Sequence, residues 1–174
     1  TIAGPIVVKE ALPELKVAAH WPSDPARSLI EADALRVIAD LIGENAVPRV
    51  LWVDAEKHRF GMALIDARLR NWKVDLLAGR VDLATAARAG EMLGELHARS
   101  STRADIAKRF ASRQFFEELR IRPYFERIAE RNPGIAAAVR EAIDAMRSAS
   151  VRALVHGDFS PKNVLADGRD VVLL

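Results

Sequence analysis

Residues 154–165 read Leu-Val-His-Gly-Asp-Phe-Ser-Pro-Lys-Asn-Val-Leu, a polar loop between two short apolar segments. The apolar segments predict two strands, and Pro161 restricts the backbone of the loop that joins them. Asn163 follows five positions after Asp158, so one short loop would hold the two side chains at a fixed separation. One interpretation is that the Asp158 carboxylate and the Asn163 amide act on the same bound molecule. The structural alternative is a polar turn in which both residues serve only turn chemistry.

The order His156-Gly157-Asp158, followed by Asn163, is similar to the catalytic loop of kinases. Because Gly157 stands where protein kinases have Arg, the loop resembles the aminoglycoside phosphotransferase family, whose members are small-molecule kinases. The resemblance implies that Asp158 receives the proton of an acceptor hydroxyl and that Asn163 holds Mg²⁺ on the ATP phosphates. It also implies that His156 anchors the loop backbone, whereas Lys162 is interpreted as an exposed residue.

Residues 6–9, Ile-Val-Val-Lys, predict a short strand that ends at Lys9. Ser23-Asp24-Pro25 predicts a helix start, and apolar residues then recur at helical spacing as far as Leu41. In a kinase-like fold a strand lysine contacts the α- and β-phosphates, and a helix glutamate holds that lysine. We therefore predict an ion pair between Lys9 and Glu31. The alternative is two unrelated, solvated charges.

The N-terminal part is similar to 5-methylthioribose kinases and to a broader group of phosphotransferases in the same superfamily. The similarity lies in residues 7–13, in His20-Trp21-Pro22, in Arg27 and in residues 31–35. Asn163 stands where methylthioribose kinases usually have Ser, so the loop favours the broader group.

Residues 47–53 and 60–65 predict two strands, and residues 54–58 join them as a hairpin. In the kinase fold such a pair ends at a hinge whose backbone groups bind adenine. The resemblance therefore assigns nucleotide binding to the stretch Met62, Ala63, Leu64 and Ile65.

The chain after the hinge is predominantly helical in its patterning. The predicted helices cover residues 82–99, 112–119, 123–131 and 133–146. A hairpin of residues 163–166 and 171–174 is predicted around the turn dipeptide Asp167-Gly168.

Several side chains in this part carry separate expectations. Gly90 and Gly94 lie one helical turn apart and predict close approach by another element. His97 is expected to form a hydrogen bond in the interior, and a ligand role is the less favoured alternative. Arg120 and Arg122 are interpreted as solvated charges, with contact to an acidic or phosphorylated substrate as the alternative.

Composition excludes several classes of protein. The chain has 174 residues, of which 50% are hydrophobic and 29% charged, as in an ordinary globular protein. Its formal net charge is only +2 and its cations are interspersed with acids, which argues against a nucleic-acid partner. No apolar run reaches membrane-spanning length. Cysteine is absent, so no disulfide or thiolate metal site can form, and a cytoplasmic enzyme fits.

We thus expect an α+β, two-lobed protein-kinase-like fold, with a small antiparallel-sheet lobe at residues 1–65 and a mainly helical lobe at residues 66–174. The chain begins near one predicted strand and stops inside another, so the fold is expected to be incomplete at both ends. The resemblance places a glycine-rich phosphate loop before Thr1 and a magnesium carboxylate after Leu174. Such a piece would be inactive alone and prone to self-association.

The expected function is ATP-dependent phosphorylation of a hydroxyl on a small molecule. Catalysis is assigned to Asp158, nucleotide binding to Lys9, Glu31 and the hinge, and magnesium binding to Asn163. One alternative is a kinase-like nucleotide-binding or interaction module without turnover. The other is a helical interaction domain with a fortuitous motif, which predicts no sheet around Lys9 and no approach of Glu31 to it.

Overall fold

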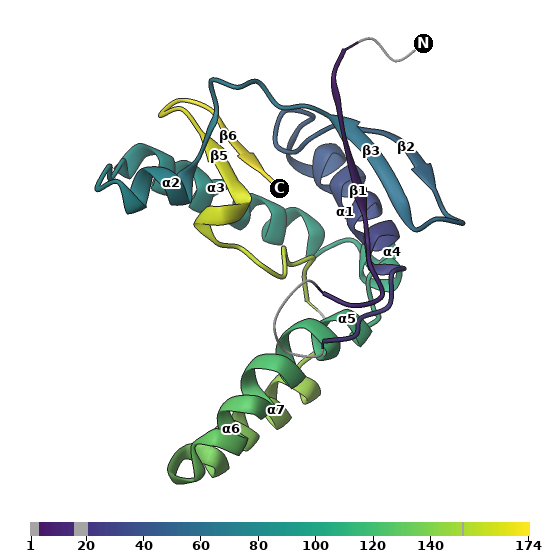
Figure 1. Cartoon of the computed structure of the whole chain (residues 1–174), viewed down its shortest axis with the longest axis vertical. Coiled ribbons are helices and arrows are strands. Elements are labelled where there is room, and N and C mark those ends of the chain that lie inside the picture. The colour runs from purple at the N-terminus through teal and green to yellow at the C-terminus, as the bar shows by residue number, and fades with distance from the viewer. Residues whose placement is uncertain (1–3, 16–20, 151) are drawn as a thin grey trace.

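The computed structural model describes residues 4–15, 21–150 and 152–174 of the chain. His20, part of the methylthioribose kinase resemblance, lies outside these residues. Two small antiparallel sheets and their helices form the upper part of the molecule in Figure 1, and a helical arm projects away from them. The α+β class with a sheet part and a helical part is therefore as predicted. None of the helices in the described ranges has the length and apolar character needed to span a membrane.

The first sheet is antiparallel, with strand order β1-β3-β2. It consists of β1 (Ile6–Glu10), β2 (Val50–Asp54) and β3 (Arg59–Ala63), close to the predicted segments. Lys9 pairs with Phe60 across the β1–β3 register. Gly61 is required on β3 because a Cβ there would lie 2.2 Å from the indole Nε1 of Trp52.

Helix α1 (Arg27–Ile42) packs against this sheet and against α3 (Leu83–Ser100). Its start is later than predicted, because Asp24 accepts a hydrogen bond from the Ala26 amide at 2.8 Å and caps the preceding turn instead. At the other end, Arg99 of α3 donates to the carbonyl of Leu41 at 2.6 Å. A cation at a helix C-terminus satisfies a carbonyl that lacks an intrahelical partner. Both ends of α1 are thus fixed.

The second sheet has the order β4-β5-β6 and lies beside helices α2 (Trp72–Leu77) and α3. Its strands are β4 (Arg70–Asn71), β5 (Val164–Ala166) and β6 (Val171–Leu173). The predicted β5–β6 hairpin is confirmed, and Asp167 accepts hydrogen bonds from the amides of Arg169 and Asp170 in its turn. The Leu173 amide also donates to the carbonyl of Ala46 at 2.8 Å, which links this sheet to the segment after α1.

The buried face of α3 differs from the predicted one. Gly90 and Gly94 are exposed, and a Cβ at either position would meet no described atom within 4 Å, so the predicted close approach is wrong. His97 Nε2 is buried but has no hydrogen-bond partner among the described residues, contrary to expectation. The face that packs into the core comprises Thr85, Ala89, Met92, Leu96 and Ser100.

The arm begins after α4 (Ala104–Arg109) and contains one continuous helical run followed by an antiparallel return. The run consists of α5 (Gln114–Phe116), the π-helix η1 (Glu117–Glu126) and α6 (Arg127–Arg131). The return consists of the 3₁₀ turn η2 (Pro133–Ile135) and α7 (Ala136–Ser148), which packs along η1 and α6 (Figure 1). A helix start at Pro123 is wrong, since Pro123 lies inside η1. The wider π turn tolerates a residue that donates no amide hydrogen bond.

One core joins the two sheets. Buried side chains from α1, β3, α3, β5 and β6 form a single cluster, which includes Leu35, Phe60, Leu96, Val164 and Leu173. The two sheets therefore share one core with α1 and α3, whereas the buried side chains of the arm, Ile121, Ala129, Ala136 and Ile143, lie outside this cluster.

Replacement of Leu96 by Ala tests this shared core. Leu96 is 0% exposed at its centre, so Leu96→Ala is expected to lower the free energy of unfolding by about 2–5 kcal/mol. The matched control is Leu77→Ala on α2, where the side chain is 78% exposed and the expected change is within about 0.5 kcal/mol. Urea unfolding monitored by circular dichroism measures both. Equal effects would contradict the placement of Leu96 at the core.

Candidate active site

Lys9 and Glu31 form an ion pair between β1 and α1, which confirms the predicted approach. The two side chains are 40% and 38% exposed, so the pair faces solvent rather than the core. Because a sheet forms around Lys9 and Glu31 reaches it, the alternative of a purely helical interaction domain is wrong. The pair is placed so that a bound anion could contact the Lys9 ammonium.

The polar loop before β5 is held by its own backbone and side chains. Gly157 has φ 78°, a conformation that residues with a Cβ rarely adopt, and this explains the glycine at this position. The side-chain amide of Asn163 donates a hydrogen bond to the carbonyl of Asp158 at 2.8 Å. The backbone amide of Asn163 donates to the carbonyl of Ser160 at 2.9 Å. Asp158 and Asn163 are therefore fixed relative to each other, as one rigid loop predicts.

His156 anchors the loop backbone, as expected. Its Nδ1 accepts a hydrogen bond from the amide of Asp158 at 3.3 Å, and its ring meets that of Phe159 edge to face at 5.9 Å. Burial lowers the pKa of His156 below 6.5, although a hydrogen bond with the backbone of Leu174 and the charge of Asp158 oppose this. Only the neutral imidazole can accept the hydrogen bond from the backbone amide of Asp158.

The lowered pKa of His156 predicts a loss of stability in acid. A group whose pKa is depressed on folding contributes stability that is present above its unfolded pKa, here 6.5, and is lost as the pH falls below it. His156→Gln should therefore show a smaller decrease in unfolding free energy between about pH 7.5 and 5 than the native chain. The control is His58→Asn, because Asn tolerates the φ of 47° at that turn. Parallel pH curves for the native chain and His156→Gln would contradict the assignment.

Asp158 is only 38% exposed and is contacted by two cations. Its Oδ2 lies 2.7 Å from Lys162 Nζ and 3.3 Å from Arg120 Nη2. Burial raises the pKa of Asp158, but the hydrogen bond from Lys162 and the charge of Arg120 outweigh it and leave the pKa below its usual value. The carboxylate thus stays ionised and able to accept a hydrogen bond from a hydroxyl group.

Sequence reasoning was wrong about one of these cations and incomplete about the other. Lys162 is exposed, as expected, but it also forms an ion pair with Asp158. Arg120 is not a solvated charge, because its side chain is 28% exposed and its Nε donates to the carbonyl of Gly157 at 2.9 Å. No local pattern could have shown this, since Arg120 lies on η1, far from the loop in sequence.

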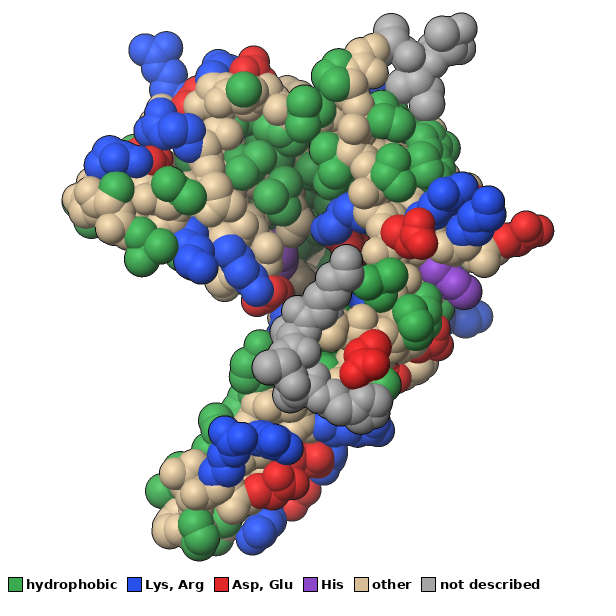
Figure 2. Space-filling model, in the orientation of Figure 1, with side chains coloured by type: hydrophobic (Ala, Val, Ile, Leu, Met, Phe, Trp, Pro, Cys, Tyr) green, Lys and Arg blue, Asp and Glu red, His purple; other side chains and the backbone are tan. Residues whose placement is uncertain are grey.

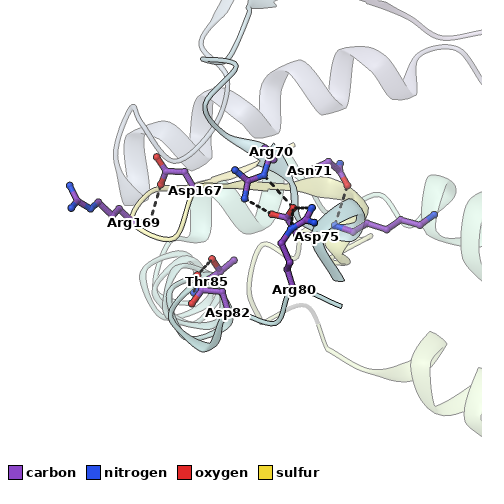
Figure 3. A network of polar contacts seen from close by, with 9 residues as sticks. Arg70, Asn71, Asp75, Arg80, Asp82, Thr85, Asp167 and Arg169 are labelled. Atoms are coloured by element: carbon purple, nitrogen blue, oxygen red, sulfur yellow. Dashed lines mark hydrogen bonds and ion pairs between the residues drawn. The ribbon is translucent and has the colours of Figure 1, made fainter. Parts of the chain in front are cut away.

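A third residue, Asn71, also supports the loop and was missed. Its side-chain oxygen caps α2 by accepting from the Lys73 amide at 3.2 Å, and its Nδ2 donates to the carbonyl of Lys162 at 2.7 Å. Figure 3 shows the adjacent network, in which Arg70 and Arg80 both hold Asp75. An Asn directly before a helical segment is an N-cap signal, which could have located this residue.

The hinge residues have part of their backbone already in use. The amides of Ala63 and Leu64 donate to the carbonyls of Arg49 and Pro5, at 2.9 and 3.3 Å. A cavity of about 560 Å³ touches Ala63, Leu64 and Ile65, but neither the Lys9–Glu31 pair nor the loop of Asp158 is among the residues that line it. This cavity therefore does not coincide with the candidate active site. Met62 is buried at the end of β3.

A metal ion is compatible with Asn163. Its Nδ2 is engaged with the Asp158 carbonyl, so its Oδ1 is the atom that could serve as a ligand. Mg²⁺ accepts a few protein oxygens and completes its coordination with phosphate and water. The described residues contain no cluster of three or more His, Asp or Glu suited to a metal.

Two comparisons with known proteins bear on this site. The model of the "Phosphotransferase enzyme family" matches residues 15–173. A comparison with curated proteins found no match.

Proposed function

The chain belongs to the phosphotransferase enzyme family, as the resemblance to aminoglycoside phosphotransferases predicted, and we propose that it transfers the γ-phosphate of ATP to a hydroxyl group of a small molecule. The observation that carries the proposal is the combination of the Lys9–Glu31 ion pair with the fixed loop of Asp158 and Asn163.

Each of the four residues has a proposed role. Lys9 contacts the α- and β-phosphates, and Glu31 orients Lys9. Asp158 accepts a hydrogen bond from the acceptor hydroxyl, and Asn163 would supply an oxygen to Mg²⁺. When bound, Mg²⁺ would neutralise charge on the phosphates.

Asp158 acts mainly by orientation in this mechanism. Phosphoryl transfer has a loose transition state in which the attacking oxygen forms little bond, so proton acceptance by Asp158 comes late. Lys162 and Arg120 keep the carboxylate ionised and limit its movement. The acceptor hydroxyl would therefore be held in line with the phosphoryl group rather than strongly activated.

In this proposal the two parts of the chain have different functions. Residues 1–65 would form the nucleotide-binding lobe, with Met62 to Ile65 as the adenine hinge, and residues 66–174 would form the helical lobe with the catalytic loop. The proposed partners are small molecules, and the proposed compartment is the cytoplasm, where ATP is available.

The alternative is a kinase-like module that binds nucleotide without turnover. The presence of Lys9, Glu31, Asp158 and Asn163 together favours an enzyme, because a module that only binds nucleotide has no use for Asp158 on the acceptor side.

The test uses the natural polypeptide that contains residues 1–174, because the 174-residue piece alone is expected to be inactive. It measures ATP consumption with a panel of aminoglycosides, methylthioribose, choline and amino alcohols, and identifies phosphorylated products by mass spectrometry. Acceptor-dependent product supports the proposal. Binding of ATP without product from any acceptor would favour the inactive module, and failure to bind ATP would overturn both.

A further inference from the structure

We infer that Arg120 is a positioning residue for Asp158, and that the π-helix η1 holds it in place for this role. The inference rests on the proposed function, because it assigns a reason to the orientation of the proposed catalytic carboxylate. Arg120 belongs to the arm and is not part of the loop motif.

Arg120 contacts two consecutive residues of the loop. Its Nε donates to the carbonyl of Gly157 at 2.9 Å, and its Nη2 lies 3.3 Å from Asp158 Oδ2. A third nitrogen, Nη1, donates to the carbonyl of Leu119 at 2.8 Å. Because the guanidinium is planar and rigid, one group fixes both the peptide before Asp158 and the rotamer of its carboxylate. A solvated surface ion pair would not engage the backbone in this way.

Lys162 does not provide the same constraint, although it lies closer to Asp158. It belongs to the same loop, its side chain is 55% exposed, and it reaches the carboxylate through a flexible stem. It can hold the charge of Asp158 but cannot fix the loop relative to the rest of the molecule. Arg120 can, since it extends from a separate element.

The π-helix itself is immobilised on its other side. Glu118 accepts hydrogen bonds from the Ser23 hydroxyl at 3.0 Å and from the Asp24 amide at 3.1 Å. The indole of Trp21 donates to the Glu118 carbonyl at 3.0 Å, and its ring meets that of Tyr124 at 5.7 Å. Residues two apart on a helix leave it on different sides. Glu118 and Arg120 therefore place η1 between the segment before α1 and the catalytic loop.

Helix α7 adds a second anchor. Arg147 contacts Glu117 at 2.7 Å and Glu126 at 2.9 Å, the first and last residues of η1. Ile121, next to Arg120, is 0% exposed. The backbone that bears Arg120 is thus fixed on several sides, as a positioning role requires.

The effect of Arg120 should appear in kcat rather than in ATP binding. The loop that Arg120 holds presents Asp158 to the acceptor, whereas ATP is proposed to be held chiefly by Lys9, Glu31 and the hinge. Asn163 lies on the same loop but has its own hydrogen bond to the Asp158 carbonyl, which Arg120→Ala leaves in place. A small misplacement of a catalytic group can lower rates by about 10²-fold. Arg120→Ala is expected to lower kcat by about 10- to 100-fold, with the KM for ATP changed by less than about twofold.

The experiment compares Arg120→Ala, Arg120→Lys and the matched control Arg122→Ala, which removes an exposed cation from the same π-helix. Arg120→Lys retains the charge but not the planar group, so a loss of kcat is expected for it also. Added guanidinium should restore part of the activity of Arg120→Ala and none of that of Asp158→Ala. Arg122→Ala should retain the native kcat. Thermal unfolding of each variant detects a general loss of fold.

Hydrogen exchange of residues 156–163 supplies a readout that does not require activity. Arg120→Ala should exchange faster there than the native chain, and Arg122→Ala should not. Equal kcat in Arg120→Ala and Arg122→Ala, or a rise in the KM for ATP as large as the fall in kcat, would overturn the inference. If the natural polypeptide that contains residues 1–174 phosphorylates no acceptor, the proposed function fails. Exchange alone then decides whether Arg120 holds the loop, and unchanged exchange overturns that role as well.

Discussion

Asp158→Ala is expected to lower acceptor-dependent turnover by about 10²- to 10⁴-fold while the affinity for ATP changes little. The carboxylate lies on the loop with two cations on Oδ2, an arrangement that keeps it ionised and able to accept a hydrogen bond from a hydroxyl group. Its removal leaves the acceptor without a fixed partner. It also leaves Lys162 and Arg120 without their anion, so some relaxation of the loop will contribute to the loss.

Single-turnover kinetics and calorimetric titration with a non-hydrolysable ATP analogue separate these effects. Asp158→Asn, which keeps the shape of the side chain, distinguishes loss of charge from loss of packing. The control is Asp144→Ala on the exposed face of α7, which should behave as the native chain. A loss of ATP affinity as large as the loss of rate would show that Asp158 acts on the nucleotide side.

The sequence was sufficient wherever the structure depends on short-range spacing. The loop from His156 to Asn163 is local, so its residue order predicts its shape. The Lys9–Glu31 ion pair, by contrast, is predicted by the resemblance to kinases, in which a helix glutamate follows a strand lysine, and the structure brings the two residues together. The hairpin of β5 and β6 followed from a turn dipeptide.

The contacts that support the loop from outside could not be predicted in the same way. Arg120 and Asn71 reach loop carbonyls, and a side chain that binds a backbone group imposes no pattern on the sequence of its partner. The strand β4 has only two residues, too few for an alternating pattern, so the N-cap signal of Asn71 could indicate the start of α2 but not the contact of Asn71 with the loop.

Helix faces were misassigned for a different reason. In α3, small residues occur on both faces, so periodicity did not separate Gly90 and Gly94 from the buried Ala89 and Met92. The π-helix was divided at Pro123 because proline usually ends an α-helix. Anchoring of η1 by the segment before α1 and by α7 overrides this local preference.

Lys9→Met is expected to lower turnover by about 10- to 100-fold and to leave the stability of the fold nearly unchanged. A hydrogen bond to a charged group contributes about 1.5–3 kcal/mol, which corresponds to this range when the group binds phosphate. In the unliganded protein, however, Lys9 and Glu31 are 40% and 38% exposed, and an ion pair so open to solvent contributes about 1 kcal/mol or less. The large effect on activity and the small effect on stability follow from the same exposure.

A double-mutant cycle with Glu31→Gln distinguishes orientation of Lys9 from an independent role of Glu31. If Glu31 acts only through Lys9, Glu31→Gln will lower turnover in the native background but add little to Lys9→Met. The control is Asp33→Asn, which removes the ion pair of Asp33 with Arg109 from the same helix and should leave turnover unchanged. Fully additive losses from Lys9→Met and Glu31→Gln would contradict the proposed arrangement, because they would require Glu31 to contact the ligand or metal by itself.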